Sequence, residues 1–247
     1  MTTTGGIEPQ VPAPKKNVFA RIAGVLFAPA EAFEEIARRP DILAPLLLTV
    51  ALGFVSVFMI VPHFDFESFT AEQASQIRRK NPETSAADAE RVGRIGAAVS
   101  KMFLWTAPVI GIVVFLVLAA VFLFAFRLMG GEGTYKQALS VTLYAWIPFV
   151  ISGIITGIVV MARGSFDPTT AATLVKSNPA FLVDMKEQPA LFSLLSSLDV
   201  FSFWMLVLLV FGFSAISTLS RKTSAAIVVT IWICYVLVKT GFAALFS

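Results

Sequence analysis

The sequence predicts an all-α polytopic membrane protein with five transmembrane helices, and three observations support this. Of its 247 residues, 57% are hydrophobic and 14% are charged, whereas soluble domains average about 25% charged residues. The mean hydropathy is +0.81. Five apolar runs are long enough to cross a hydrocarbon layer of about 30 Å as helices. These spans are expected at about residues 42–61, 104–126, 138–162, 200–219 and 225–245.

The chain before the first span divides into two parts. Residues 1–16 lack an apolar period and predict a disordered tail. Residues 17–40 show helical spacing of apolar residues, interrupted at Pro29, with basic side chains around them. This pattern predicts an amphipathic segment either on an anionic membrane face or packed on the end of the bundle. The apolar residues are Phe19, Ile22, Leu26, Phe33 and Ile36, and the basic ones are Lys15, Lys16, Arg21, Arg38 and Arg39. Residues 41–247 then form one membrane domain.

Two long charged loops, residues 63–103 and 163–198, separate spans and each predicts a helical part. In the first, Val92, Ile95, Val99 and Met102 lie at helical spacing and lead into the second span. In the second, Pro189 begins a short helix that is expected along the membrane interface. Its apolar face is formed by Leu191, Leu194, Leu195 and Leu198.

The third span follows a glycine-rich turn. Gly131 and Gly133 disfavour helix, and Thr134 with Gln137 fits a capping box at the next helix start. Pro148 removes a backbone donor and its ring opposes the carbonyl of Tyr144. A kink is therefore expected between these two residues.

Small residues follow this kink on one side of the same span. Gly153 and Gly157 form a GxxxG face on which another helix can pack closely. The third span is therefore expected near the centre of the bundle.

Three segments resemble the Yip-one domain family in its short bacterial form. They are LFAPAEAFEEIARRPDILAPLLL before the first span, GGEGTYKQALSVTLYAWIP at the glycine-rich turn, and LDVFSFWMLVLLVFGFSAIS in the fourth span. The most specific positions are Gly131, Gly133, the block from Tyr144 to Pro148, Asp199, Trp204 and Gly212. The resemblance implies a five-helix integral membrane domain with a cytoplasmic N-terminus. Eukaryotic members are linked to Golgi and endoplasmic-reticulum trafficking and to Rab-type GTPases through a long N-terminal region, and the short tail here does not predict that partner.

Basic residues in short loops predict the orientation in the membrane. The turns at 127–136 and 220–223 fall on the same side as the N-terminal segment and carry more basic than acidic residues. Short basic loops remain in the cytoplasm. We expect an inner-membrane protein with a cytoplasmic N-terminus and an outer C-terminus. The basic residues are Arg127, Lys136, Arg221 and Lys222, against the single acid Glu132.

No motif in the sequence predicts catalysis, a cofactor or nucleic-acid binding. His63, Asp65 and Glu67 could hold a metal ion or a proton, but one histidine and two acids in a loop are more often solvated surface. The glycine-rich turn lacks the lysine and hydroxyl of a phosphate-binding loop. The pI of about 9.1 arises from basic residues at span ends, which is typical of membrane proteins.

Polar residues within the spans leave a transport role open. Lys239 can extend to the interface or serve a buried function. One side of the third span is polar, which predicts either a solute route or hydrogen bonds between helices. That side consists of Ser140, Thr142, Tyr144, Ser152 and Thr156. Asp199 is expected to cap the fourth span, Trp204 to pack in the bundle and Trp105 to anchor at the interface.

The sequence therefore favours a non-catalytic protein that organises the membrane or acts as an adaptor, trafficking-like in role. The alternative is a passive lipid or small-solute carrier that uses the kinked third span. The expected partners are the lipid bilayer and either another membrane protein or further copies of the chain. No metal and no cofactor are expected.

Overall fold

The structure is a computed structural model that describes residues 17–166 and 173–245, so the tail expected at residues 1–16 lies outside it. Five segments are long and apolar enough to cross a membrane, which confirms the predicted fold class. They are α3 (Leu43–Ile60) with the short η1 (Val61–His63), α5 (Ala86–Leu128), α6 (Tyr135–Ala145) continued by α7 (Ile147–Arg163), α9 (Val200–Ser217) and α10 (Arg221–Leu245).

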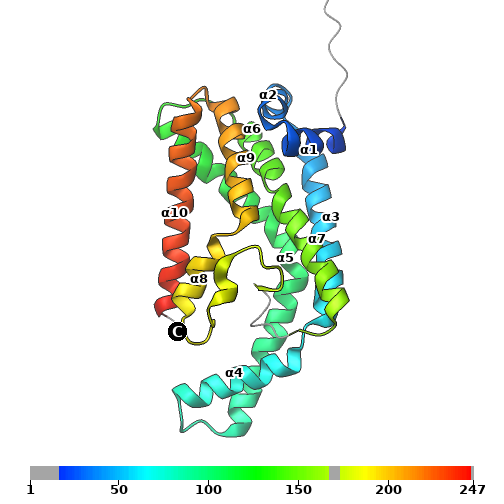
Figure 1. The fold of residues 1–247 in the computed structure, drawn as a ribbon, viewed down its shortest axis with the longest axis vertical. Coiled ribbons are helices and arrows are strands. Elements are labelled where there is room, and N and C mark those ends of the chain that lie inside the picture. The colour runs from blue at the N-terminus through cyan, green and yellow to red at the C-terminus, as the bar shows by residue number, and fades with distance from the viewer. Residues whose placement is uncertain (1–16, 167–172, 246–247) are drawn as a thin grey trace, which may run out of the picture.

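The remaining helices lie at the two ends of this bundle (Figure 1). At one end are α1 (Val18–Phe27), α2 (Pro29–Arg38) and the turns that join α5 to α6 and α9 to α10. At the other end lie η3 (Pro179–Leu182), α8 (Pro189–Ser197) and the end of α10. The first and last described residues are therefore at opposite ends, as an odd number of spans requires.

The N-terminal helices pack on the end of the bundle. Phe33 and Ile36 of α2 are fully buried, and the Phe33 ring contacts α9 at Gly212. Val25 of α1 is also fully buried, whereas Phe19 is exposed. Of the two arrangements that the amphipathic pattern allowed, packing against the bundle accounts for α2.

The third span is interrupted at Trp146, within the interval where the kink was expected. The capping box is present, because Thr134 Oγ1 accepts from Gln137 N at 3.3 Å and Gln137 Oε1 accepts from Thr134 N at 2.8 Å. After α6 the chain turns at Trp146, and Pro148 lies in the first turn of α7. A proline is tolerated there since its missing N–H would be unpaired in any case.

Glycines bring two pairs of helices into close contact. A Cβ on Gly153 or Gly157 would lie 3.0 Å from Ser56 Oγ or 2.9 Å from Met59 Cβ, so the GxxxG face of α7 packs on α3. A Cβ on Gly212 would lie 2.3 Å from Val141 Cγ1, so α9 approaches α6 equally closely. Gly133 has φ of +118°, a backbone conformation that other residues rarely adopt.

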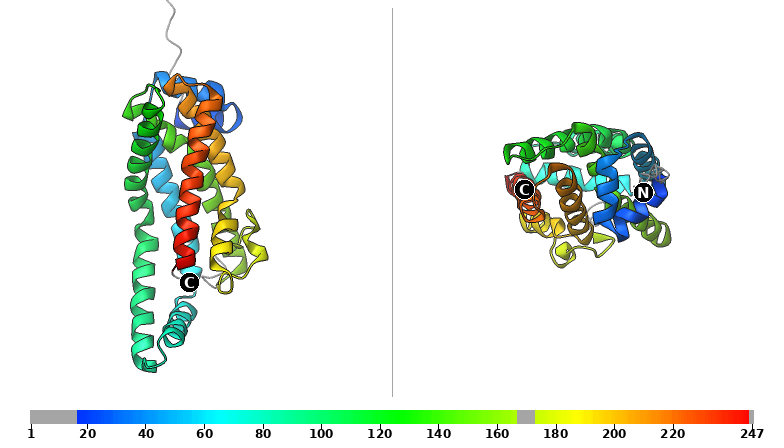
Figure 2. Two further views of the ribbon diagram at one scale, coloured as in Figure 1. Left: turned by 90° about the vertical axis from the view of Figure 1, so that its left-hand side faces the viewer. Right: turned by 90° about the horizontal axis from the view of Figure 1, so that it is seen from above.

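Helix α5 is much longer than a span and projects beyond the bundle together with α4 (Phe66–Lys80). Its 43 residues extend over about 65 Å at 1.5 Å per residue. Figure 2 shows α4 beside the projecting part of α5. Ala89, Gly93 and Ala97 form the buried face of this part, and Gly93 lies directly against the backbone of α4 at Thr70.

Candidate functional site

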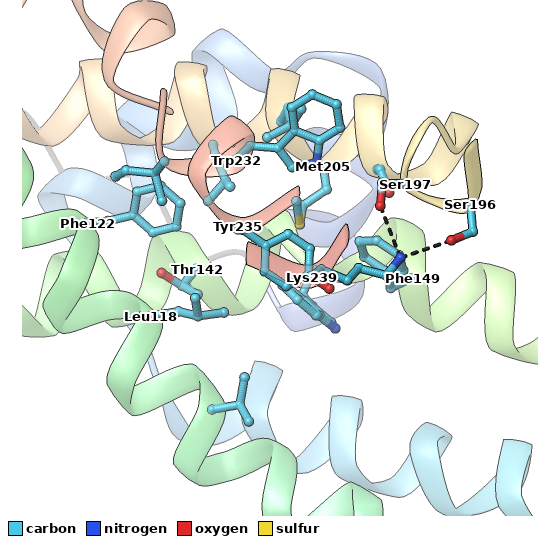
Figure 3. A pocket seen from close by; sticks show the side chains of 16 residues that line it. Leu118, Phe122, Thr142, Phe149, Ser196, Ser197, Met205, Trp232, Tyr235 and Lys239 are labelled. Atoms are coloured by element: carbon cyan, nitrogen blue, oxygen red, sulfur yellow. Dashed lines mark hydrogen bonds between the residues drawn. The ribbon is translucent and has the colours of Figure 1, made fainter. Parts of the chain in front are cut away.

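A cavity of about 490 Å³ lies among α5, the third span, α8, α9 and α10. Its walls are mainly aromatic and aliphatic side chains, among them Trp146 and Phe149 near the break in the third span. Figure 3 shows Phe149 together with Trp232 and Tyr235 in this lining. Trp146 is the residue that separates α6 from α7, so the break in the third span lies at the cavity wall. The other apolar lining residues are Val114, Leu118, Phe122, Met205, Leu206, Leu209, Ile231, Trp232 and Tyr235.

One end of the cavity is polar and carries a cation. Lys239 Nζ donates to Ser196 Oγ at 2.9 Å, to Ser197 Oγ at 3.0 Å and to Ser193 O at 3.3 Å. Figure 3 shows the ammonium directed at the two serine hydroxyls of α8. No carboxylate within residues 17–166 and 173–245 forms an ion pair with Lys239. Among the described residues, the hydrogen-bond partners of this charge are thus neutral oxygens.

The position of Lys239 places this cation close to one membrane surface. It follows Arg221 by 18 residues, a distance of about 27 Å along a helix, and the hydrocarbon layer is about 30 Å thick. The lysine therefore reaches the interface level, as the snorkelling interpretation requires, but its ammonium turns inward to α8. The apolar part of the cavity extends from there toward the middle of the bundle.

The cavity opens sideways between α5 and α10. Val114 of α5 and Tyr235 of α10 both line it, and their side chains are 42% and 59% exposed. Both residues belong to helices that are long and apolar enough to cross a membrane.

A second feature, a buried polar cluster, joins the N-terminal helices to the third span. Arg21 Nη1 donates to Asp41 Oδ1 at 2.6 Å, and Tyr144 Oη donates to the same carboxylate at 3.1 and 3.2 Å. Arg21 Nη2 lies 3.3 Å from Glu35 Oε1, and Ser140 Oγ donates to Asp41 O at 2.8 Å. The cluster holds α1 and the start of α3 against α6.

The environment of Arg21 favours one of the two arrangements that the sequence left open. The sequence counted this residue among the positive charges of the amphipathic segment, and only 1% of its side chain is exposed. Burial lowers the pKa of Arg21, but Asp41 and Tyr144 outweigh burial and raise the pKa above its ordinary value. Arg21 is therefore a structural cation within the protein, held by Asp41, a partner that the sequence did not identify.

The polar side of the third span serves several hydrogen bonds and does not form one continuous surface. Ser140 and Tyr144 bond to Asp41, whereas Thr142 and Thr156 donate to carbonyls of their own helix. Thr142 lines the large cavity. Ser152 and Thr156 line a separate cavity of about 220 Å³ that also contains Asp199.

The other residues singled out in the sequence have local roles. Asp199 caps α9 by accepting from Phe201 N at 2.8 Å, and Ser177 Oγ donates to its other oxygen. Trp204 packs against the core, and Trp105 contacts Phe58 edge to face. A Cβ on Gly131 would lie 2.9 Å from Phe126 O, which explains the glycine in that turn.

The histidine and acids after the first span lie beside the α4 terminus. Asp65 caps α4 by accepting from Ser68 N at 2.9 Å and Ser68 Oγ at 2.6 Å, and these bonds lower its pKa. His63 Nδ1 lies 3.1 Å from Met59 O. Within the described parts of the chain, no three such side chains are placed to share a metal ion.

These features define a class: a helical membrane protein of five spans with an apolar cavity that opens to the bilayer. A family model described as the Yip1 domain matches residues 23–242, and the chain therefore belongs to that family. It is similar to membrane protein YknW of Bacillus subtilis (strain 168), with 26% identity over 200 residues that cover 81% of this chain and 79% of YknW. No solved structure matches the chain.

Proposed function

We propose that this Yip1-domain protein is a non-catalytic lipid-binding protein of the cytoplasmic membrane. Its ligand is an anionic lipid with one acyl chain in the cavity and its headgroup at Lys239. The observation that supports this most directly is the cation at the interface end of an apolar cavity. This arrangement matches the charged headgroup and the apolar chain of an amphiphile. Of the two hypotheses drawn from the sequence, we therefore place the lipid-related one before the adaptor.

The electrostatics favour an anion over a neutral ligand. A charge at the edge of the hydrocarbon is costly when only neutral oxygens surround it. A carboxylate or phosphate oxygen beside Lys239 Nζ lowers that cost through a charge-assisted hydrogen bond. The hydroxyls of Ser196 and Ser197 each donate to Ser193 O at 2.9 Å. Their oxygens therefore accept from Lys239 Nζ and hold the ammonium in place for the headgroup. Ligand selection thus depends on charge at one end and on shape along the aromatic walls.

The size and lining of the cavity favour an acyl chain. At about 490 Å³ it lies within the range of about 300–1,000 Å³ of ordinary ligand sites. Apart from Thr142, Ser196, Ser197, Ser202 and Lys239, its lining consists of apolar and aromatic side chains. A second acyl chain of a phospholipid can remain in the bilayer at the opening between α5 and α10.

Quenching of tryptophan fluorescence tests this proposal, because Trp146 and Trp232 line the cavity. We expect a fatty acid brominated on its chain to quench saturably, and its uncharged methyl ester to need a concentration at least about 10-fold higher. Lys239→Met should weaken binding of the acid by a similar factor, about 1.4 kcal/mol. Lys222→Met, which removes a lysine at the opposite end of α10, serves as the control and should bind normally.

Two results would count against the proposal. Quenching that rises linearly with the probe, without saturation, would mean simple partition into lipid. Equal affinity of the acid and its ester in the parent protein would remove the role of Lys239. A normal unfolding temperature for Lys239→Met is required for either comparison.

The adaptor hypothesis remains the second candidate because α4 and the start of α5 project beyond the spans (Figure 1). Tyr135, at the other end of the bundle, is 41% exposed and offers a further point of contact. A photo-crosslinking residue at Tyr135 in native membranes should give one discrete protein adduct if the chain is an adaptor. A smear of lipid adducts there would contradict that role.

A further inference from the structure

The projecting part of α5 carries an apolar stripe that no helix within the described chain covers. Val92, Ile95, Val99 and Met102 are 51%, 56%, 54% and 63% exposed. They lie on the side of α5 opposite to Ala89, Gly93 and Ala97, which pack on α4. Figure 2 shows α4 on one side of this segment only.

This stripe lies outside the hydrocarbon layer. Trp105 packs on Phe58 near the end of α3, and Lys101 Nζ lies 5.5 Å from the ring centre of Phe66, beyond that end. The preceding part of α5, residues 86–103, therefore extends past the first span by about 27 Å. Its companion α4 carries charges typical of a helix in water. Lipid does not account for the exposed stripe.

The spacing of the stripe identifies the kind of partner. Apolar residues fall at intervals of three and four, with a period of 3.5, which is the seam of a coiled coil rather than the wider face of a globular helix. The same register continues into the span without a break. Positions a are Val92, Val99, Thr106 and Val113, and positions d are Ile95, Met102, Val109 and Leu116, all of them exposed.

We propose that this seam is a homodimer interface, in which α5 pairs with α5 of a second copy. Copies inserted alike in one membrane present α5 in parallel, so each a position meets its own counterpart about a twofold axis along the membrane normal. Every a position is β-branched, as in two-stranded parallel coiled coils, and Leu116 is the one d position with the leucine that accompanies this pattern. The inference goes beyond lipid binding and does not depend on it.

The flanks of the seam are compatible with close pairing. In a parallel pair, g positions oppose e positions of the partner. Arg91 at g meets Gly96 at e, and Ala98 at g meets Phe103 at e, so no like charges oppose each other. Arg94 and Lys101 lie at c positions, away from the axis. The Arg94 guanidinium is held by Glu90 of the same helix, at 2.5 Å.

Disulfide formation in native membranes tests the seam. In a background with Cys234→Ser, which removes the single cysteine, Val99→Cys should give a covalent dimer of twice the 26.7 kDa chain mass on mild oxidation. The Cα atoms at a positions of a parallel pair approach within the range of about 4.4–6.8 Å that a disulfide needs. Arg94→Cys, equally exposed but at position c, is the control and should form at least 10-fold less.

A second variant separates loss of the interface from loss of the fold. Ile95 and Val99 are exposed in the single chain, so Ile95→Glu with Val99→Glu should leave folding and lipid binding intact while raising the dimer dissociation constant at least 10-fold. The interface is refuted if both cysteine variants cross-link equally, if Val99→Cys joins only a different protein, or if the double variant keeps the dimer. Lipid binding is measured separately, so its failure is distinguishable from that of the dimer.

Discussion

Substitution of Tyr144 by phenylalanine tests the polar cluster that joins the N-terminal helices to the third span. Tyr144 is fully buried, and its hydroxyl donates to both oxygens of Asp41 at 3.1 and 3.2 Å. A hydrogen bond to a charged group contributes about 1.5–3 kcal/mol. Tyr144→Phe removes this bond without changing the ring, so the free energy of unfolding should fall by that amount.

The same reasoning predicts a larger effect for Asp41. Asp41→Ala leaves the guanidinium of Arg21 buried without its closest carboxylate, and breaking a buried ion pair in this way costs about 3–5 kcal/mol. Glu35 Oε1 lies 3.3 Å from Arg21 Nη2, so this second carboxylate offsets part of that loss. The order of stability should therefore be parent, then Tyr144→Phe, then Asp41→Ala.

Thermal unfolding in mild detergent measures both effects. For a chain of this size about 1 kcal/mol corresponds to about 2–4 °C, so Tyr144→Phe should lower Tm by about 3–12 °C. Tyr235→Phe is the matched control, because Tyr235 is 59% exposed and its substitution should change Tm little. An unchanged Tm for Tyr144→Phe, or an equal loss for the control, would refute the structural role of the cluster.

Two further predictions concern packing and orientation. Gly212→Ala places a methyl group 2.3 Å from Val141 Cγ1, so it should lower the free energy of unfolding by about 1–3 kcal/mol. Gly241→Ala is the control, because its added methyl group meets nothing within 4 Å and should leave stability unchanged. Equal losses for the two variants in thermal unfolding would contradict this packing. A reporter fused after the last residue should be active only outside the cytoplasm, because the short loops with Arg127 and Arg221 lie at the end opposite to α8. A cytoplasmic signal would show that the orientation inferred from charge is inverted.

The sequence predicted those features that depend on neighbouring residues. Hydropathy located the five spans, and the Thr134 and Gln137 pair located the start of α6, because both signals are contained in short windows. The break near Pro148 follows from the chemistry of one residue. The projecting part of α5 was visible as apolar residues at helical spacing, which fixed the helix but not its partner.

Features that depend on distant residues escaped sequence reasoning. Asp41 meets Tyr144 across 103 positions and Arg21 across 20. Hydropathy treats Arg21 and Asp41 as separate charges before the first span and Tyr144 as a polar residue within the third. The cavity is formed by side chains from six helices, so no segment predicts it alone. Lys239 did stand out as a charge within a span, but the serines that hold it were identified only by the packing of α8 on α10.

Mapping the site of a photoreactive lipid tests the central proposal most directly. A fatty acid with a diazirine on its chain is bound to the purified protein in lipid nanodiscs, activated by light and located by mass spectrometry of peptides. We predict adducts on cavity residues such as Leu118, Met205 and Trp232, which an excess of unlabelled fatty acid prevents and Lys239→Met reduces. Adducts confined to exposed residues outside the cavity such as Ile158, unaffected by competitor, would contradict the account.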